Sequence, residues 1–180
     1  MKPRLIILSD LFGFSNCVWI EKYVKHFSKS FEVQLYDSCE LAEIYTVDQT
    51  QEVFHQKFVS EGIDKAVTKL LELEKGFVHV LAFSIGGTIA WKANLKGLKV
   101  RTLLAVSSTR LRKEFKRPTC NVKLIFGSDD EYIPSSEWFE KMQIEKDILE
   151  DRGHDVYKDS DFVKALTLDF DNLYFKPIEN

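Results

Sequence analysis

Residues 77–91 read FVHVLAFSIGGTIAW, an apolar run that passes through a serine and two glycines into a second apolar run. The first half is typical of a short strand, and the second half has the apolar spacing of a helix. A strand that turns directly into a helix at Ser84 must fold back closely on itself. Such packing needs very small residues on both sides of the turn. Ala82 and Gly86 meet this need, so the stretch predicts a strand, a tight turn at Ser84 and a helix.

Two later segments place an acid and a histidine after strand-like runs. Residues 122–126, VKLIF, lead into GSDDEYIP, which contains two adjacent aspartates and ends in a proline suited to open a helix. Residues 148–154, ILEDRGH, end in a glycine followed by His154. Serine, aspartate and histidine therefore occur in that order along the chain, each directly after a predicted strand.

With these three segments the chain resembles the α/β-hydrolase superfamily. Residues 82–86, AFSIG, are similar to its nucleophile elbow, G-x-S-x-G, with alanine in the first small position. The resemblance extends over about residues 4–170. It implies a nucleophile at Ser84, a general base at His154, no metal and no cofactor.

The position of the acid depends on how its loop is aligned with the family pattern. When Gly127 and Pro134 are matched to that pattern, the acid is Asp130, and Asp129 is the alternative. In the arrangement that the resemblance implies, this acid orients the histidine and stabilises its cationic form.

The resemblance also implies two backbone N–H donors for the oxyanion of a tetrahedral intermediate. One is Ile85, directly after the nucleophile, and the other is Leu11, in the loop after the first predicted strand. Relatives often have His-Gly where this chain has Ser9 and Asp10. An inward carboxylate would repel the developing charge, so Asp10 points away, binds a positive group of the substrate, or hydrogen-bonds the backbone of its own turn. We expect the last of these, which is common for aspartate in turns.

Four residues near the carboxyl ends of predicted strands are candidates for the substrate pocket. Asp10 and Phe12 belong to the loop after the first strand, and Ser107 and Ser108 follow the apolar run 100–106. Turn chemistry explains the two serines equally well.

Strand and helix patterns alternate along the whole chain, which favours a parallel sheet covered on both faces. Strand patterns occur at residues 5–8, 31–36, 78–83, 100–106, 122–126 and from 148. One helix pattern begins after Asn16, which could cap it, and others occur at residues 63–73, 85–91, 135–145 and 159–170. Residues 37–60 predict a loop and a short helix. The resemblance implies a three-layer α/β-hydrolase fold, with a mostly parallel sheet of about six strands, helices on both faces and no lid domain. We expect residues 1–180 to form a single domain.

Composition excludes several classes of function. The chain has 180 residues, 44% of them hydrophobic, and a net charge of −3, which provides no field that would attract nucleic acid. The longest uncharged stretch, residues 76–91, is interrupted by glycines and is shorter than the roughly 18 residues of a membrane helix. Three widely spaced cysteines, Cys17, Cys39 and Cys120, indicate free thiols in a reducing cytoplasm. We therefore expect a cytoplasmic protein that binds neither nucleic acid nor membrane.

The leading functional interpretation is a serine hydrolase that cleaves a small carboxylic ester or thioester through an acyl-enzyme. An amidase or peptidase is an alternative, because the acyl step is common to all of these enzymes. A non-catalytic binding protein of the same fold is another, because Ser9 and Asp10 depart from the oxyanion pattern.

Residues 110–117, RLRKEFKR, carry five positive charges and one negative charge. They form either a solvated helix face or a patch that attracts a substrate carried on an acidic acyl carrier or on coenzyme A.

Overall fold

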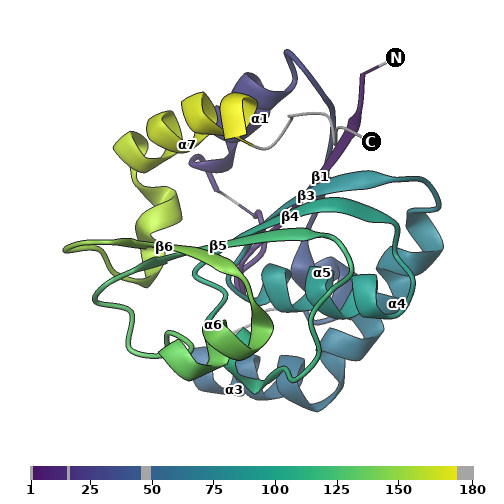
Figure 1. The fold of residues 1–180 in the computed structure, drawn as a ribbon. Helices are drawn as coiled ribbons and strands as arrows, with labels where there is room; N and C mark the ends of the chain where they lie inside the picture. The colour runs from purple at the N-terminus through teal and green to yellow at the C-terminus, as the bar shows by residue number, and fades with distance from the viewer. Residues whose placement is uncertain (1, 16, 46–49, 174–180) are drawn as a thin grey trace.

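The centre of the molecule is a six-stranded sheet, as seen in the computed structural model, which describes residues 2–15, 17–45 and 50–173 (Figure 1). The strands are β1 (Arg4–Leu8), β2 (Glu32–Tyr36), β3 (Val78–Phe83), β4 (Val100–Val106), β5 (Asn121–Gly127) and β6 (Glu145–Leu149). Their order across the sheet is β2-β1-β3-β4-β5-β6, and every neighbouring pair is parallel. The predicted parallel sheet of about six strands is confirmed.

Helices cover both faces of this sheet. The α-helices are α1 (Ile20–Phe27), α2 (Ser38–Ala42), α3 (Gln51–Lys57), α4 (Ile63–Leu73), α5 (Ile85–Leu95), α6 (Ser136–Met142) and α7 (Ser160–Leu173). Helices α1 and α7 lie together on one face, and α3, α4, α5 and α6 lie on the other (Figure 1). Among the described residues, no helix is long and apolar enough to cross a lipid bilayer.

Three short helical segments complete the chain path. A π-helical turn, η1 (Phe58–Gly62), joins α3 to α4. A 3₁₀ helix, η2 (Thr109–Lys113), follows β4, and a second one, η3 (His154–Lys158), precedes α7. The predicted helix over residues 63–73 is confirmed as α4. The basic run from residue 110 forms only the short η2, and the chain then returns to β5 without an inserted domain.

The core consists of two apolar layers separated by the sheet. All six side chains of β3 are buried, as expected of a central strand with helices on both sides. Val80 and Ala82 pack toward α4 and α5, whereas Leu81 and Phe83 pack toward α1 and α7. Val80, Leu81 and Phe83 each contribute roughly 1.5–3 kcal/mol when the side chain leaves water. The strand that leads to Ser84 is therefore held from both faces.

Sequence patterns misplaced the last strand. β6 spans Glu145–Leu149, three residues earlier than the run from residue 148, and α6 ends at Met142 rather than at residue 145. Gln143, with φ 50°, terminates this helix in the left-handed conformation. β6 is an edge strand whose first four residues are exposed, so its charged sequence lacks the apolar pattern of a buried strand.

Other boundaries also differ from the sequence expectation. The described part of residues 37–60 contains two α-helices and the start of η1 rather than one short helix. The side chains of Asp37 and Thr50 cap α2 and α3, respectively. α7 extends to Leu173, and Ala165, expected to face inward, is exposed. The expected cap Asn16 lies outside the described residues, and α1 begins at Ile20.

Candidate active site

The candidate site lies at the carboxyl edge of the sheet, where open α/β sheets place their ligands. All strands are parallel, so the segments after β1, β3, β5 and β6 emerge at the same edge. These segments carry Asp10, Ser84, Asp130 and His154 in turn. The topology alone therefore brings together residues that lie far apart in the sequence.

Ser84 occupies a strained turn between β3 and α5. Its backbone angles are φ 49° and ψ −116°, a region that a residue with a side chain rarely adopts. A Cβ atom on Gly86 would lie 2.5 Å from the Ser9 carbonyl oxygen, and one on Gly87 would lie 2.0 Å from Ser108 Oγ. The two glycines are therefore required because α5 packs directly against the loops after β1 and β4.

The side chains of Ser84, His154 and Asp130 form one hydrogen-bonded series. The Ser84 Oγ–His154 Nε2 distance is 2.9 Å, and the His154 Nδ1–Asp130 Oδ2 distance is 2.7 Å. A carboxylate only accepts hydrogen bonds, so Nδ1 carries the ring proton and Nε2 is left to accept the proton of the serine hydroxyl. This arrangement can activate a hydroxyl nucleophile.

Of the two aspartates left open by the sequence, the structure places Asp130 against the histidine. Its side chain is only 4% exposed, whereas Asp129 is exposed and accepts a hydrogen bond from the Ser128 hydroxyl. The loop is fixed beneath the histidine segment, because the Asp129 amide donates to the Arg152 carbonyl at 2.9 Å. A Cβ atom on Gly127 would lie 2.1 Å from that same oxygen, which explains the glycine.

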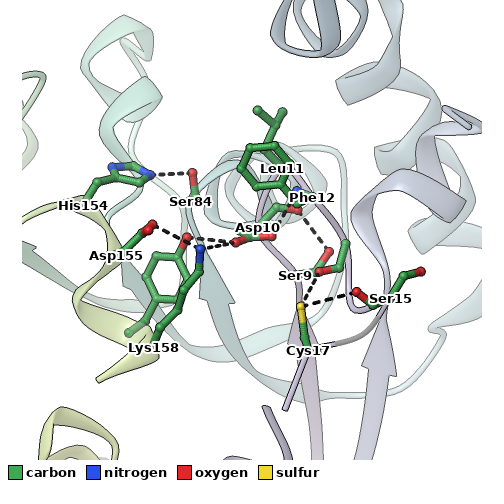
Figure 2. Close-up of polar contacts among 12 residues, drawn as sticks. Ser9, Asp10, Leu11, Phe12, Ser15, Cys17, Ser84, His154, Asp155 and Lys158 are labelled. Carbon is green, nitrogen blue, oxygen red and sulfur yellow. Dashed lines mark hydrogen bonds and ion pairs between the residues drawn. The ribbon is translucent and has the colours of Figure 1, made fainter. Parts of the chain in front are cut away.

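Asp10 is buried, and its carboxylate lies in a network of hydrogen-bond donors (Figure 2). Oδ1 accepts a hydrogen bond from the Phe12 amide at 3.0 Å, and Oδ2 accepts one from the Tyr157 hydroxyl at 2.9 Å. Lys158 Nζ lies 3.7 Å from Oδ2. Burial, and then the charge of Asp10, raise the pKa of Tyr157, so the phenol stays protonated and donates. Asp10 thus ties the loop after β1 to η3, the segment that begins with His154.

Ser9 anchors the same loop to α2. Its hydroxyl accepts a hydrogen bond from the Ser38 amide at 2.7 Å, and the Ser38 hydroxyl donates to the Ser9 carbonyl at 2.8 Å. Leu11 and Ile85, the expected oxyanion donors, both border the cavity beside Ser84. Within the described part of the chain, neither backbone amide donates to a protein acceptor. Both N–H groups are therefore available to a ligand.

A cavity of about 1110 Å³ opens over Ser84 and His154. Asp10 and Phe12 border it as expected, and Phe12 is half exposed at its edge. Ser107 and Ser108, also expected there, do not line it and are fully buried. Ser108 packs against Gly87 of α5 instead. The assignment of the two serines as pocket residues is corrected.

The comparisons with known proteins rest on structure alone. No protein-family model and no curated protein matches the chain. Alpha/beta hydrolase domain-containing protein 10 from mouse superposes with a TM-score of 0.65 at 15% identity, covering 96% of this chain and 90% of that one. A CIB-like hydrolase from Thermoplasma acidophilum gives a TM-score of 0.66 at 20% identity, covering 94% of this chain and 87% of that one.

A third structure, from work on carboxylesterases of the archaeon Nitrososphaera gargenis, gives a TM-score of 0.62 at 16% identity. It covers 96% of this chain and 88% of that chain. The chain has the α/β-hydrolase fold. This confirms the predicted fold class, with the helices of the fold on both faces of the sheet.

In this α/β-hydrolase fold, several cavity residues were not foreseen as site residues. They are His55 of α3, Arg110 and Arg112 of η2, Tyr132 and Tyr157. The two arginines belong to the basic run seen in the sequence, but only the structure separates them from Lys113, Lys116 and Arg117, which are exposed and do not border the cavity. Tyr157 has no local signal, since its partner Asp10 lies 147 residues away.

Proposed function

We propose that this chain is a serine hydrolase that cleaves a small carboxylic ester or thioester through an acyl-enzyme. The observation that carries the proposal is the hydrogen-bonded series from Ser84 through His154 to Asp130 beside the cavity. A hydroxyl is a weak nucleophile unless a base takes its proton during attack, and the contact between Ser84 and His154 supports this role for His154.

In the proposed mechanism Ser84 Oγ attacks the carbonyl carbon while His154 Nε2 takes the hydroxyl proton. Asp130 holds the imidazole in position and stabilises its cationic form. The negative charge of the tetrahedral intermediate is stabilised by the amides of Leu11 and Ile85, and the amide at the start of α5 also benefits from the helix dipole. His154 then gives the proton to the leaving group, and a water molecule, activated by the same histidine, hydrolyses the acyl-enzyme.

The environment of Asp10 supports activity rather than a purely binding role. Two hydrogen-bond donors engage its carboxylate and a lysine ammonium lies nearby, so these partners offset the negative charge that departs from the family's oxyanion pattern. We further propose a reducing, cytoplasmic setting, which the three free cysteines support. The proposed substrate is a small molecule or an acyl group carried on coenzyme A or an acyl-carrier protein.

Hydrolysis of a graded series of 4-nitrophenyl esters tests the proposal. The wild-type protein should turn over at least one chain length, and Ser84→Ala should abolish that turnover while its circular dichroism stays unchanged. Matched thioesters and anilides separate thioesterase and amidase activity. Near-parent turnover by Ser84→Ala, or a wild-type protein silent toward every ester and every thioester, would contradict the proposal.

A further inference from the structure

The cavity over Ser84 has a positively charged wall. Arg110 and Arg112 lie in η2, which follows β4, the strand between those that lead to Ser84 and Asp130. Both arginines border the same cavity as Ser84 and His154. A group bound to them would therefore share this cavity with the reacting carbonyl.

Arg110 is partly buried and lacks an acceptor where burial requires one. Its Nε atom is inaccessible to solvent and has no hydrogen-bond partner. By contrast, Arg4 pairs with Glu74 and Arg152 with Asp159. A guanidinium remains charged at any physiological pH, and leaving a buried donor unsatisfied costs free energy. The Arg110 side chain as a whole is only partly buried and borders the cavity, so its charge can act on an anion bound there.

Arg112 is held in position next to Arg110. Its Nη1 donates to the Thr109 carbonyl at 2.9 Å, and its guanidinium lies 5.0 Å from the centre of the Tyr132 ring. His55 of α3 also borders this cavity, and its pKa is lowered first by burial and then by the charges of Arg110 and Arg112. The charges of both arginines thus reach the same region of the cavity.

Acidic residues also border the cavity, but they do not neutralise this wall. Asp130, Asp10 and Asp155 are engaged by His154, by Tyr157 and by Lys158, respectively. The remaining acids, Glu52, Asp129 and Glu131, are exposed at the rim, where solvent and salt screen them. Among the described residues, none of the six forms an ion pair with Arg110 or Arg112.

We propose that Arg110 and Arg112 form an anion-binding subsite, and that the substrate carries a carboxylate or phosphate group besides the bond that is cleaved. Guanidinium groups bind both anions through paired, charge-assisted hydrogen bonds. The inference rests on the proposed hydrolase function and narrows its substrate class. It assigns recognition to these two residues, and not to the exposed Lys113, Lys116 and Arg117.

Two pairs of substrates distinguish the sources of the anion. Mono-4-nitrophenyl glutarate and 4-nitrophenyl pentanoate differ by a carboxylate at the end of the acyl chain. Pentanoyl-phosphopantetheine and pentanoyl-pantetheine differ by one phosphate on the leaving group. In at least one pair, Arg110→Gln should lower kcat/KM for the anionic member relative to the neutral one about tenfold or more. Lys113→Gln, an exposed cation of the same segment, should leave that ratio within about twofold.

Calorimetric binding of glutarate and of inorganic phosphate separates this inference from the hydrolase proposal. Arg110→Gln and Arg112→Gln should each weaken binding of at least one anion about tenfold, and Lys113→Gln should not. Anion binding that depends on these arginines, in a protein that hydrolyses nothing, would keep the subsite and reject the hydrolase. An unchanged substrate ratio together with unchanged anion affinity would overturn the subsite. Where one arginine variant fails to fold by circular dichroism, the other decides.

Discussion

Tyr157→Phe tests the contact that joins the loop after β1 to the histidine segment. Tyr157 is 1% exposed and Asp10 2% exposed, and the bond between them is 2.9 Å long. The substitution removes one hydroxyl and leaves a buried carboxylate with one donor fewer. A hydrogen bond to a charged group contributes about 1.5–3 kcal/mol. For a chain of this size, a loss of about 2 kcal/mol lowers Tm by roughly 4–8 °C.

The same substitution should also lower turnover. Asp10 holds the Phe12 amide as well as the Tyr157 hydroxyl, so a loosened carboxylate frees the loop that carries the Leu11 amide. Loss of an entire oxyanion donor costs about 10²–10³ in kcat, and a displaced donor should cost less, roughly tenfold. We expect kcat to fall more than KM rises, measured on the best ester of the graded series.

A double-mutant cycle isolates the bond from other effects of the substitutions. In an Asp10→Ala background, Tyr157→Phe should lower the free energy of unfolding by at least 1 kcal/mol less than it does in the wild-type protein, because the partner of the hydroxyl is already absent. This difference corresponds to a coupling energy of about 1–2 kcal/mol between the two residues. Tyr45→Phe, at a tyrosine that is 74% exposed, is the matched control and should leave Tm unchanged. If Tyr157→Phe lowered the free energy of unfolding equally in both backgrounds, the Asp10–Tyr157 bond would not stabilise the protein.

Two further predictions concern the acid and a buried histidine. Asp130→Asn should lower kcat in an ester assay roughly 10³–10⁴-fold, by analogy with the serine-protease triad, while Asp129→Asn should have a much smaller effect. The reverse ranking would show that Asp129, and not Asp130, is the acid. Burial, and then the charge of Arg101, lower the pKa of His79 from 6.5 to about 4. Between these two pH values the imidazole is protonated in the unfolded chain but stays neutral in the folded chain. Urea unfolding should therefore show stability falling between about pH 6.5 and pH 4, by about 3 kcal/mol in total, and His79→Gln should remove that part of the pH dependence.

The elbow could be predicted because its physical requirement is local. A strand that reverses into a helix needs small residues at fixed offsets from Ser84, and those residues are adjacent in the sequence. The structure adds which atoms impose the requirement, namely the Ser9 carbonyl against Gly86 and Ser108 Oγ against Gly87. The loop pattern favoured Asp130 but kept Asp129 as an alternative, because neighbouring residues of a loop differ only in the direction in which they point.

Features that depend on distant contacts could not be predicted. β6 was misplaced because an exposed edge strand does not need the apolar residues that reveal a buried one. Ser107 was assigned to the pocket from its place after β4, although the end of a strand does not determine whether a side chain points into a cavity. The Asp10–Tyr157 bond joins residues 147 positions apart, and no local pattern connects them.

Reaction with a fluorophosphonate, followed by intact mass measurement and peptide mapping, tests whether Ser84 is an activated nucleophile, because the reagent phosphonylates an activated serine. We predict one adduct, on Ser84, that is absent in Ser84→Ala and forms far more slowly in His154→Ala. Ser60→Ala, at an exposed serine outside the cavity, should be labelled like the wild-type protein. An adduct that persists in Ser84→Ala, or a folded wild-type protein that does not react, would contradict the account.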